Sequence, residues 1–162
     1  MTSVRTLAIL PILLLPISLR SGAQTGGPSE STTHPSAGCT LRIHVDGLRN
    51  SKGNIGTIVF TSAAGWPEDK NKALRVGPAP IDPGQRKGTA VWKDLPPGVY
   101  GVAAIHDENS NAKLDKNLIG IPKEGFGFAN NPHVGWGPPP FSAALVHVAC
   151  PVTEVAIHIQ YK

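Results

Sequence analysis

Apolar residues recur at every second position near both ends of the region 39–162. The alternation is first seen at Leu41, Ile43 and Val45, and it returns in residues 155–161 near the carboxyl terminus. A period of two places successive side chains on opposite faces of a β-strand. The pattern therefore predicts a strand at each end of this region, with one face in the core and one in water.

Further strands are predicted between these two, separated by turns rich in Gly and Pro. Residues 74–81 contain prolines that confine the strand to a sheet edge, whereas residues 99–106 are apolar on both faces and indicate a central strand. The other predicted strands are residues 54–61, 88–95 and 141–148. Residues 67–73 are predicted to form a short helix.

The fold class that follows is all-β. About seven short strands in a region of this size predict a Greek-key β-sandwich of two sheets. Residues 108–140 interrupt the rhythm, because they are rich in Gly, Pro and Asn and contain no convincing strand. They are also too apolar to be disordered, so we expect one long ordered loop and look for function there.

The amino terminus has the layout of a signal peptide. A basic residue precedes the apolar run 7–19, which is shorter than the roughly 20 residues that a membrane-spanning helix needs. Ser21 and Ala23 then supply the small residues of a cleavage site. We expect residues 1–23 to be removed rather than kept as an anchor, which predicts an exported protein, periplasmic or extracellular, with no membrane span after cleavage.

The remaining chain divides into a tether and one domain. Residues 24–38 consist largely of Ser, Thr, Gly and Pro and are predicted to be a flexible tether, followed by a β-sandwich domain at residues 39–162. Cys39 and Cys150 are the two cysteines of the chain. In an exported protein such a pair predicts a disulfide rather than two separate thiols, and this one would make the first and last strands run parallel.

Charge excludes one class of partner. The chain carries 15 Lys and Arg against 11 Asp and Glu, a net charge of +4. Two of the basic residues lie in the signal peptide, so 13 − 11 leaves +2 on the mature chain. Because these basic residues are scattered, we expect no nucleic-acid partner. We expect a monomer that meets an envelope or extracellular partner, or a glycan.

Three strings of the sequence resemble one family. Residues 94–100 read Asp-Leu-Pro-Pro-Gly-Val-Tyr, residues 105–109 read Ile-His-Asp-Glu-Asn, and residues 120–131 read Gly-Ile-Pro-Lys-Glu-Gly-Phe-Gly-Phe-Ala-Asn-Asn. The chain resembles the exported bacterial family known as domain of unknown function 2141 over residues 39–162. The resemblance implies a bacterial source and a transthyretin-like or immunoglobulin-like sandwich, and no established activity. At Ala112 the family usually has Gly.

The acidic start of the long loop is a candidate calcium site. Asp107, Asn109, Asn111 and Asp115 occupy positions 1, 3, 5 and 9 of an EF-hand-like spacing, and the Lys113 carbonyl falls at position 7. The spacing lacks the Gly of position 6 and the bidentate carboxylate of position 12. The alternative is that the same side chains bond to their own backbone in consecutive Asx turns. Either would order the loop.

The function predicted from these features is a non-catalytic binding or structural module, not an enzyme, with loop 107–140 as its interaction surface. Glu124, Phe126, Phe128 and Trp136 are the candidate ligand-binding residues of that loop. The alternative function is a carbohydrate-binding or carbohydrate-active protein that uses the same aromatics and the loop carboxylates. Exposure of the rings distinguishes the two, because sugar binding needs solvent-facing rings and a packing role buries them.

Overall fold

The structure of the protein is a computed structural model that describes residues 38–162. The predicted signal peptide at residues 1–23 and, apart from Gly38, the predicted tether at residues 24–38 lie outside the described residues. Within the described range, no helix has the length and apolar character needed to cross a membrane.

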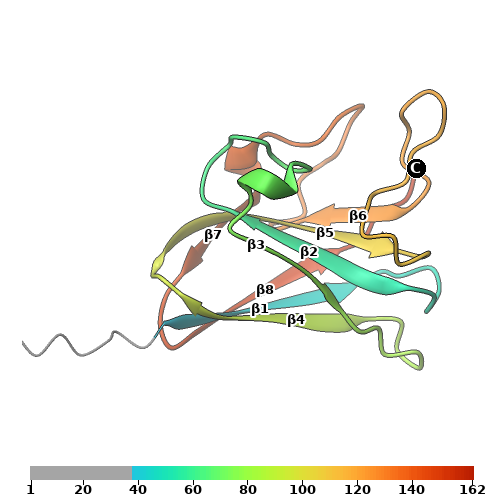
Figure 1. The fold of residues 1–162 in the computed structure, drawn as a ribbon. Helices are drawn as coiled ribbons and strands as arrows, with labels where there is room; N and C mark the ends of the chain where they lie inside the picture. Colours follow the sequence, from blue (N-terminus) through green and yellow to red (C-terminus); the bar gives the residue numbers. More distant parts are fainter. Residues whose placement is uncertain (1–37) are drawn as a thin grey trace, which may run out of the picture. The chain divides into compact units, whose positions relative to one another are not determined.

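The described residues form an all-β domain of two sheets (Figure 1). The three-stranded sheet has the order β4 (Gly88–Leu95), β1 (Cys39–Asp46) and β8 (Val152–His158). The five-stranded sheet has the order β3 (Arg75–Ala79), β2 (Asn54–Phe60), β5 (Gly98–Asp107) and β6 (Gly125–Phe128), with β7 (Leu145–Val148) also paired to β5. The all-β prediction is confirmed. The finer Greek-key, transthyretin-like or immunoglobulin-like assignment stays a prediction.

Strand β5 is the central strand that its two apolar faces predicted. Its residue Gly101 pairs with Phe60 of β2 on one side and with Leu145 of β7 on the other. Strand β6 pairs with β5 farther along, from Ala103 to His106, so β6 and β7 follow one another along the same edge.

The main core lies between the two sheets. Buried side chains of the three-stranded sheet, such as Leu41 and Ile157, belong to the same apolar cluster as Ile55, Val59 and Val102 of the five-stranded sheet. The inward positions of each strand are two residues apart, as the alternation in the sequence predicted. A β-sandwich arrangement of the two layers follows from this shared core.

A disulfide closes the domain. Cys39 and Cys150 are bonded at an S–S distance of 2.05 Å, with their Cα atoms 4.4 Å apart. Strands β1 and β8 run parallel, in register from Thr40 opposite Val152 to Asp46 opposite His158. Both the disulfide and the parallel pairing of the first and last strands are confirmed.

Three sequence assignments are corrected. Residues 108–140 contain strand β6, and there are eight strands among the described residues instead of seven. Residues 141–148 begin as a 3₁₀ helix, η2 (Phe141–Ala144), so that β7 is half the predicted length. The helix predicted at residues 67–73 is reduced to a 3₁₀ turn, η1 (Lys70–Lys72).

Strand β6 was not predicted from the sequence because two of its four residues are glycine. Gly125 and Gly127 alternate with Phe126 and Phe128, and glycine contributes no apolar side chain to a period of two. Glycine is required by packing here, since a Cβ added at Gly127 would lie 2.6 Å from Cγ2 of Ile157. The close approach of β8 and of the residues that follow it therefore requires glycine in β6.

The disulfide is expected to supply much of the stability of the domain. It joins residues 111 positions apart, and constraining a loop of that length in the unfolded chain is worth about 4–5 kcal/mol. Replacing Cys39 and Cys150 together by Ala should lower the free energy of unfolding by about that amount, measured by urea denaturation. Reduced wild-type protein is the control and should behave like the double variant. An unchanged urea midpoint after reduction would contradict this role.

Candidate functional site

The outer face of the five-stranded sheet carries a second, smaller core and a groove. Ala103, Phe126 and Phe128 are buried there, against Val134 and Ala144 of the segment that follows β6. These side chains point away from the main core because each lies one residue from an inward-facing position. The sheet is therefore covered on both faces.

The groove lies beside this second core. Its floor is the sheet itself, through Gly56 and Ile58 of β2, Ile105 of β5 and the rings of Phe126 and Phe128. Three segments that rise from the outer side of the sheet in Figure 1 form its walls: residues 67–70, residues 112–122 and residues 133–138. The cavity volume is about 1180 Å³.

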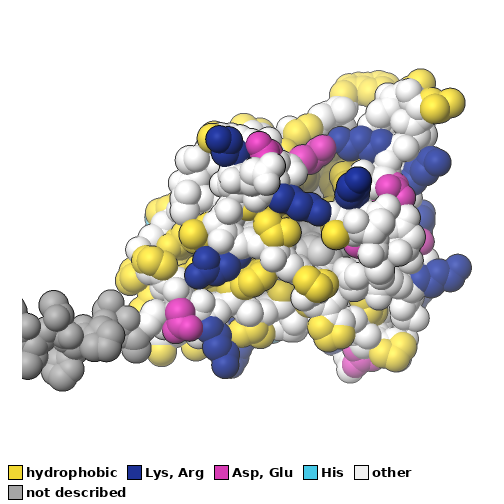
Figure 2. Space-filling view, viewed as in Figure 1, with side chains coloured by type: hydrophobic (Ala, Val, Ile, Leu, Met, Phe, Trp, Pro, Cys, Tyr) yellow, Lys and Arg dark blue, Asp and Glu magenta, His cyan; other side chains and the backbone are white. Residues whose placement is uncertain are grey.

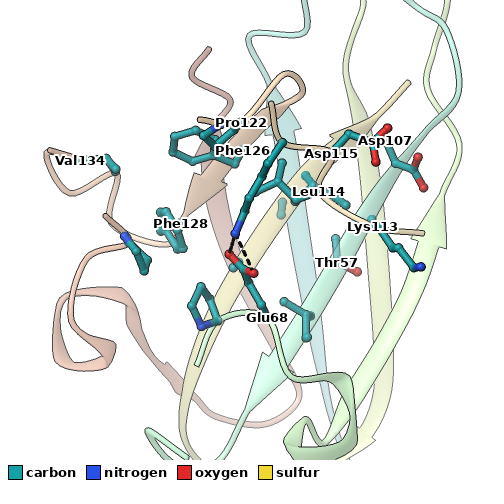
Figure 3. Close-up of a pocket in the computed structure, with 18 of the residues that line it drawn as sticks. Thr57, Glu68, Asp107, Lys113, Leu114, Asp115, Pro122, Phe126, Phe128 and Val134 are labelled. Atoms are coloured by element: carbon teal, nitrogen blue, oxygen red, sulfur yellow. Dashed lines mark hydrogen bonds and ion pairs between the residues drawn. The ribbon is translucent and has the colours of Figure 1, made fainter. Parts of the chain in front are cut away.

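The lining of the groove is mainly apolar, and charged side chains also line it, with Asp107 and Asp115 on one side and Lys162 beside Val134 on another. Figure 3 shows Phe126, Phe128 and Val134 on one side of the cavity, while the carboxylates of Asp107 and Asp115 lie together at another. Such a lining suits a ligand that is apolar over most of its surface and carries a few polar groups.

Two lysines connect the walls. Nζ of Lys116 lies 2.6 Å from Oε1 of Glu68, an ion pair drawn as dashed lines in Figure 3. Nζ of Lys70 donates to the carbonyl oxygen of Ala112. The segment after β2 is thus tied to the loop after β5 across one end of the groove.

The other end of the same segment is held by Trp66. Its indole Nε1 donates to the carbonyl of Pro139 at 3.0 Å, and its ring contacts Phe60, Phe128 and Phe141. This cluster of rings packs the loops onto the sheet.

The start of the long loop folds as consecutive Asx turns. The carboxylate of Asp107 is buried and accepts the backbone N–H groups of Asn111 at 3.0 Å and Ala112 at 2.7 Å. The Oδ1 atoms of Asn109 and Asn111 accept the N–H groups two residues ahead of each. The side chain of Asp115 then accepts from both Asn side-chain amides, at 2.7 and 3.1 Å. Four predicted calcium ligands, Asp107, Asn109, Asn111 and Asp115, are therefore brought together.

Lys113, the fifth predicted ligand, donates its backbone N–H to Asn111, and its side chain lines the groove. Among the described residues there is no group of three or more His, Cys, Asp or Glu side chains placed to hold a metal ion.

Glu124 stabilises the start of the long loop through hydrogen bonds. It was predicted as part of a ligand surface, but its carboxylate is buried and does not line the groove. The two oxygens accept the backbone N–H groups of Glu108 at 2.8 Å and Asp115 at 3.0 Å, so one side chain joins both ends of the acidic turn. Because both oxygens are buried and bonded to backbone N–H groups, this carboxylate stabilises the loop instead of contacting a ligand.

The aromatic candidates divide into two kinds. Phe126 and Phe128 are buried in the second core, as the packing interpretation predicts. Trp136 instead has a relative exposure of 104% at the tip of its loop. The long loop is therefore pinned by two of its predicted aromatics and presents the third to solvent.

Sequence reasoning missed a polar cluster beneath the start of the loop. His106 is fully buried, with Nε2 2.9 Å from the carbonyl of Lys52 and Nδ1 2.6 Å from the hydroxyl of Tyr161. Because a carbonyl only accepts, Nε2 carries the proton. The guanidinium of Arg49 lies 4.6 Å from the ring centroid of Tyr161 and pairs with Glu108 at 2.6 Å.

Electrostatics favour the charged form of Glu108 in this cluster. Burial acts to raise the pKa of its carboxyl, but hydrogen bonds from Asn50 and Arg49 outweigh burial and hold the pKa below its usual range. Burial raises the pKa of the Tyr161 hydroxyl. No local signal could have revealed the cluster, because Arg49 and Tyr161 are 112 residues apart in the chain.

Comparison with known proteins agrees with the resemblance drawn from the motifs. The profile of a bacterial family described as "Uncharacterized protein conserved in bacteria (DUF2141)" matches residues 43–156. The chain belongs to this family. The match spans the acidic turn, strand β6 and all three walls of the groove. No curated protein and no solved structure matches the chain.

Within this DUF2141 chain, Ala112 adopts the conformation that glycine would favour. Its φ is +61°, in the left-handed region. An alanine there costs about 1–2 kcal/mol in steric strain, which glycine avoids. Ala112→Gly should therefore stabilise the domain by about 1 kcal/mol and raise its melting temperature by a few degrees.

Ala149→Gly is the matched control for that experiment. Ala149 is also exposed but is not among the residues with positive φ, so glycine there should give no gain in stability. A lower melting temperature for Ala112→Gly would show that the strain at Ala112 is not relieved by glycine.

Proposed function

We propose that the protein is an exported, non-catalytic binding module, and that its ligand is a small, largely apolar molecule held in the groove on the outer face of the five-stranded sheet. The observation that carries the proposal is the groove itself. It combines a volume of about 1180 Å³ with a mostly apolar lining that also contains charged side chains. Pockets for small molecules in proteins have this composition and a similar size.

How the carboxylates of the loop are used supports a binding rather than a catalytic role. Asp107 and Glu124 each accept two backbone N–H groups, and both side chains are buried. A general acid or base must reach the proton that it moves. These two side chains instead hold the acidic turn from which one wall of the groove continues.

The carbohydrate alternative has less support. Stacking on sugars needs several exposed rings, and Phe126 and Phe128 are buried in the second core. Trp136 is exposed but stands by itself at a loop tip. The export of the protein is supported by the signal-peptide pattern and by the Cys39–Cys150 disulfide, which is typical of oxidising compartments.

A charged side chain placed in the lining of the groove tests the proposal. Val76 of β3 lines the groove and is 42% exposed, so that Val76→Glu should fold normally. Because an apolar ligand would then desolvate an unpaired carboxylate, we expect at least about tenfold weaker binding of the apolar dye Nile red, measured by fluorescence titration.

The matched control is Val91→Glu. Val91 has nearly the same exposure, 46%, but lies on β4 of the other sheet. It should bind the dye as the wild type does. Equal loss in both variants, or dye binding that neither variant changes, would count against the groove. Native mass spectrometry of protein isolated from its own host would identify a retained ligand.

We also propose that the acidic turn binds Ca²⁺ weakly. Support comes from the convergence of oxygen-bearing side chains at Asp107, Asn109, Asn111 and Asp115, with the carbonyl of Lys113 as a further oxygen. Two formal charges and no bidentate carboxylate place the expected dissociation constant at about 10⁻⁴–10⁻³ M. The turn is already closed by hydrogen bonds, so calcium would reinforce an existing structure.

The expected result is a rise in melting temperature of a few degrees in about 10 mM Ca²⁺, reversed by chelator, since ligation at that concentration adds up to about 2.7 kcal/mol. Asp107→Ala should abolish the rise. Ala112→Gly should enlarge it by easing the left-handed backbone at the centre of the turn. If neither calcium nor chelator changes the melting temperature of the wild type, the turn is an Asx scaffold without metal.

A further inference from the structure

Beyond the groove, we propose that the protein docks on the surface of a lipid bilayer that contains anionic headgroups, and that it does so through the tips of two loops. The first tip is the turn at residues 117–121 and the second is the loop at residues 133–138. The proposal concerns where the protein works, and it does not depend on the ligand of the groove.

The first tip exposes two large aliphatic side chains. Leu118 and Ile119 have relative exposures of 107% and 80%, so neither contributes to a core. They occupy the two central positions of a turn closed by a hydrogen bond from the N–H of Gly120 to the carbonyl of Asn117 at 3.0 Å. Central turn positions are usually polar. Leaving Leu and Ile there exposes their apolar surface to water, which is unfavourable, and no packing contact within the domain offsets that cost.

This turn is firmly held. Oδ1 of Asn117 accepts the N–H groups of Ile119 at 3.1 Å and Ile121 at 2.9 Å, and the N–H of Asn117 donates to the carbonyl of Ile121 at 2.8 Å. Lys116 and Pro122 are bridged directly below it. The two aliphatic side chains are therefore presented on a preorganised support, which lowers the entropy lost when they insert into another phase.

The second tip presents an aromatic ring. Trp136 has a relative exposure of 104% and lies between Gly135 and Gly137, where an added Cβ would meet nothing within 4 Å. Tryptophan is the residue that most often marks the interface between lipid and water. Ile119 and Trp136 both line the groove, from opposite walls, so the two tips stand on the same side of the domain.

Charge around the tips matches an anionic surface. The exposed charged residues of segment 112–137 are Lys113, Lys116 and Lys123, whereas Glu124 is buried and Asp115 is half-buried. Lys116 is paired with Glu68, but the side chains of Lys113 and Lys123 form no ion pair within the described part of the chain. Figure 2 shows hydrophobic atoms at the upper edge of the molecule, with Lys and Arg side chains and some Asp and Glu side chains below them.

A bilayer fits this surface better than a protein partner does. The apolar side chains are few, fully exposed and carried on projecting tips, whereas a stable protein interface needs a broad surface of roughly 800 Å² on each partner. A bilayer accepts projecting apolar side chains into its acyl boundary, and basic residues beside them gain from the anionic headgroups.

The test is flotation of the protein with vesicles of phosphatidylethanolamine and phosphatidylglycerol. The double variant Leu118→Ser/Ile119→Ser should bind about tenfold less than the wild type, because two insertable side chains are lost. Emission of Trp136 should shift to the blue on binding and become protected from acrylamide, and Trp136→Phe should remove that signal. Salt should weaken binding, as expected for headgroup attraction.

Val91→Ser/Val152→Ser is the matched control. It removes two aliphatic side chains that are exposed on the three-stranded sheet, and it should bind vesicles as the wild type does. Wild type and variants are compared in the same processed form, so differences among them report on the tips. The groove variant Val76→Glu should keep vesicle binding, while the single variant Leu118→Ser, at a tip residue that does not line the groove, should keep Nile red binding, which separates this proposal from the proposed function.

Two results would overturn membrane docking. One is vesicle binding by the wild type that is absent or is unchanged in the double tip variant. The other is a dimer, measured by light scattering without lipid, that the double tip variant converts to monomer, since the tips would then contact a second copy of the chain.

Discussion

Strand β5 is buried on both of its faces, and the positions of the other elements follow from this. Val102 and Ala104 point into the core between the sheets, while Ala103 packs into the second core on the outer face. Both edges are occupied as well, by β2 on one side and by β6 and β7 on the other. Every loop that builds the groove must therefore start or finish at this strand or at its direct neighbours.

The acidic turn beside the groove begins at the end of β5. Asp107 is the last residue of the strand, and its buried carboxylate begins the acidic turn by capping the next backbone N–H groups. Glu124, just before β6, then fastens the turn from the other side. Buried carboxylates are costly unless their oxygens are fully bonded, so these two serve as rigid supports. The wall formed by residues 112–122, with its projecting turn at residues 117–121, is thereby held against the end of the sheet.

A groove for an apolar ligand and loop tips suited to a bilayer complement each other physically. Apolar molecules are scarce in water and concentrated in membranes, so a binding site benefits from standing at the lipid surface. The turn at residues 117–121 serves both purposes, because Ile119 and Ile121 line the groove while Leu118 projects from it. One short segment therefore connects the two proposals, although each rests on its own observations.

The sequence by itself determined the fold class, the central strand, the parallel first and last strands and the disulfide. The strands depend on periods of two and on apolar runs, which are local signals. The disulfide and the parallel pairing that it implies follow from there being two cysteines in the chain, although they lie 111 positions apart. The acidic turn was also recognisable, since Asp and Asn bond to backbone groups only a few residues away. Strand β6 was missed because Gly125 and Gly127 carry no apolar pattern, and they must be glycine because β8 and the residues after it pack closely against them.

Only the tertiary structure decided which residues of the long loop are functional candidates. In the folded domain Glu124, Phe126 and Phe128 are buried, whereas Leu118, Ile119 and Trp136 are exposed to solvent. The tertiary structure also assembled the cluster of His106, Tyr161 and Arg49 from distant parts of the chain. Exposure and long-range contact depend on how the layers pack, and a sequence pattern within one loop carries no information about the sheet beneath it.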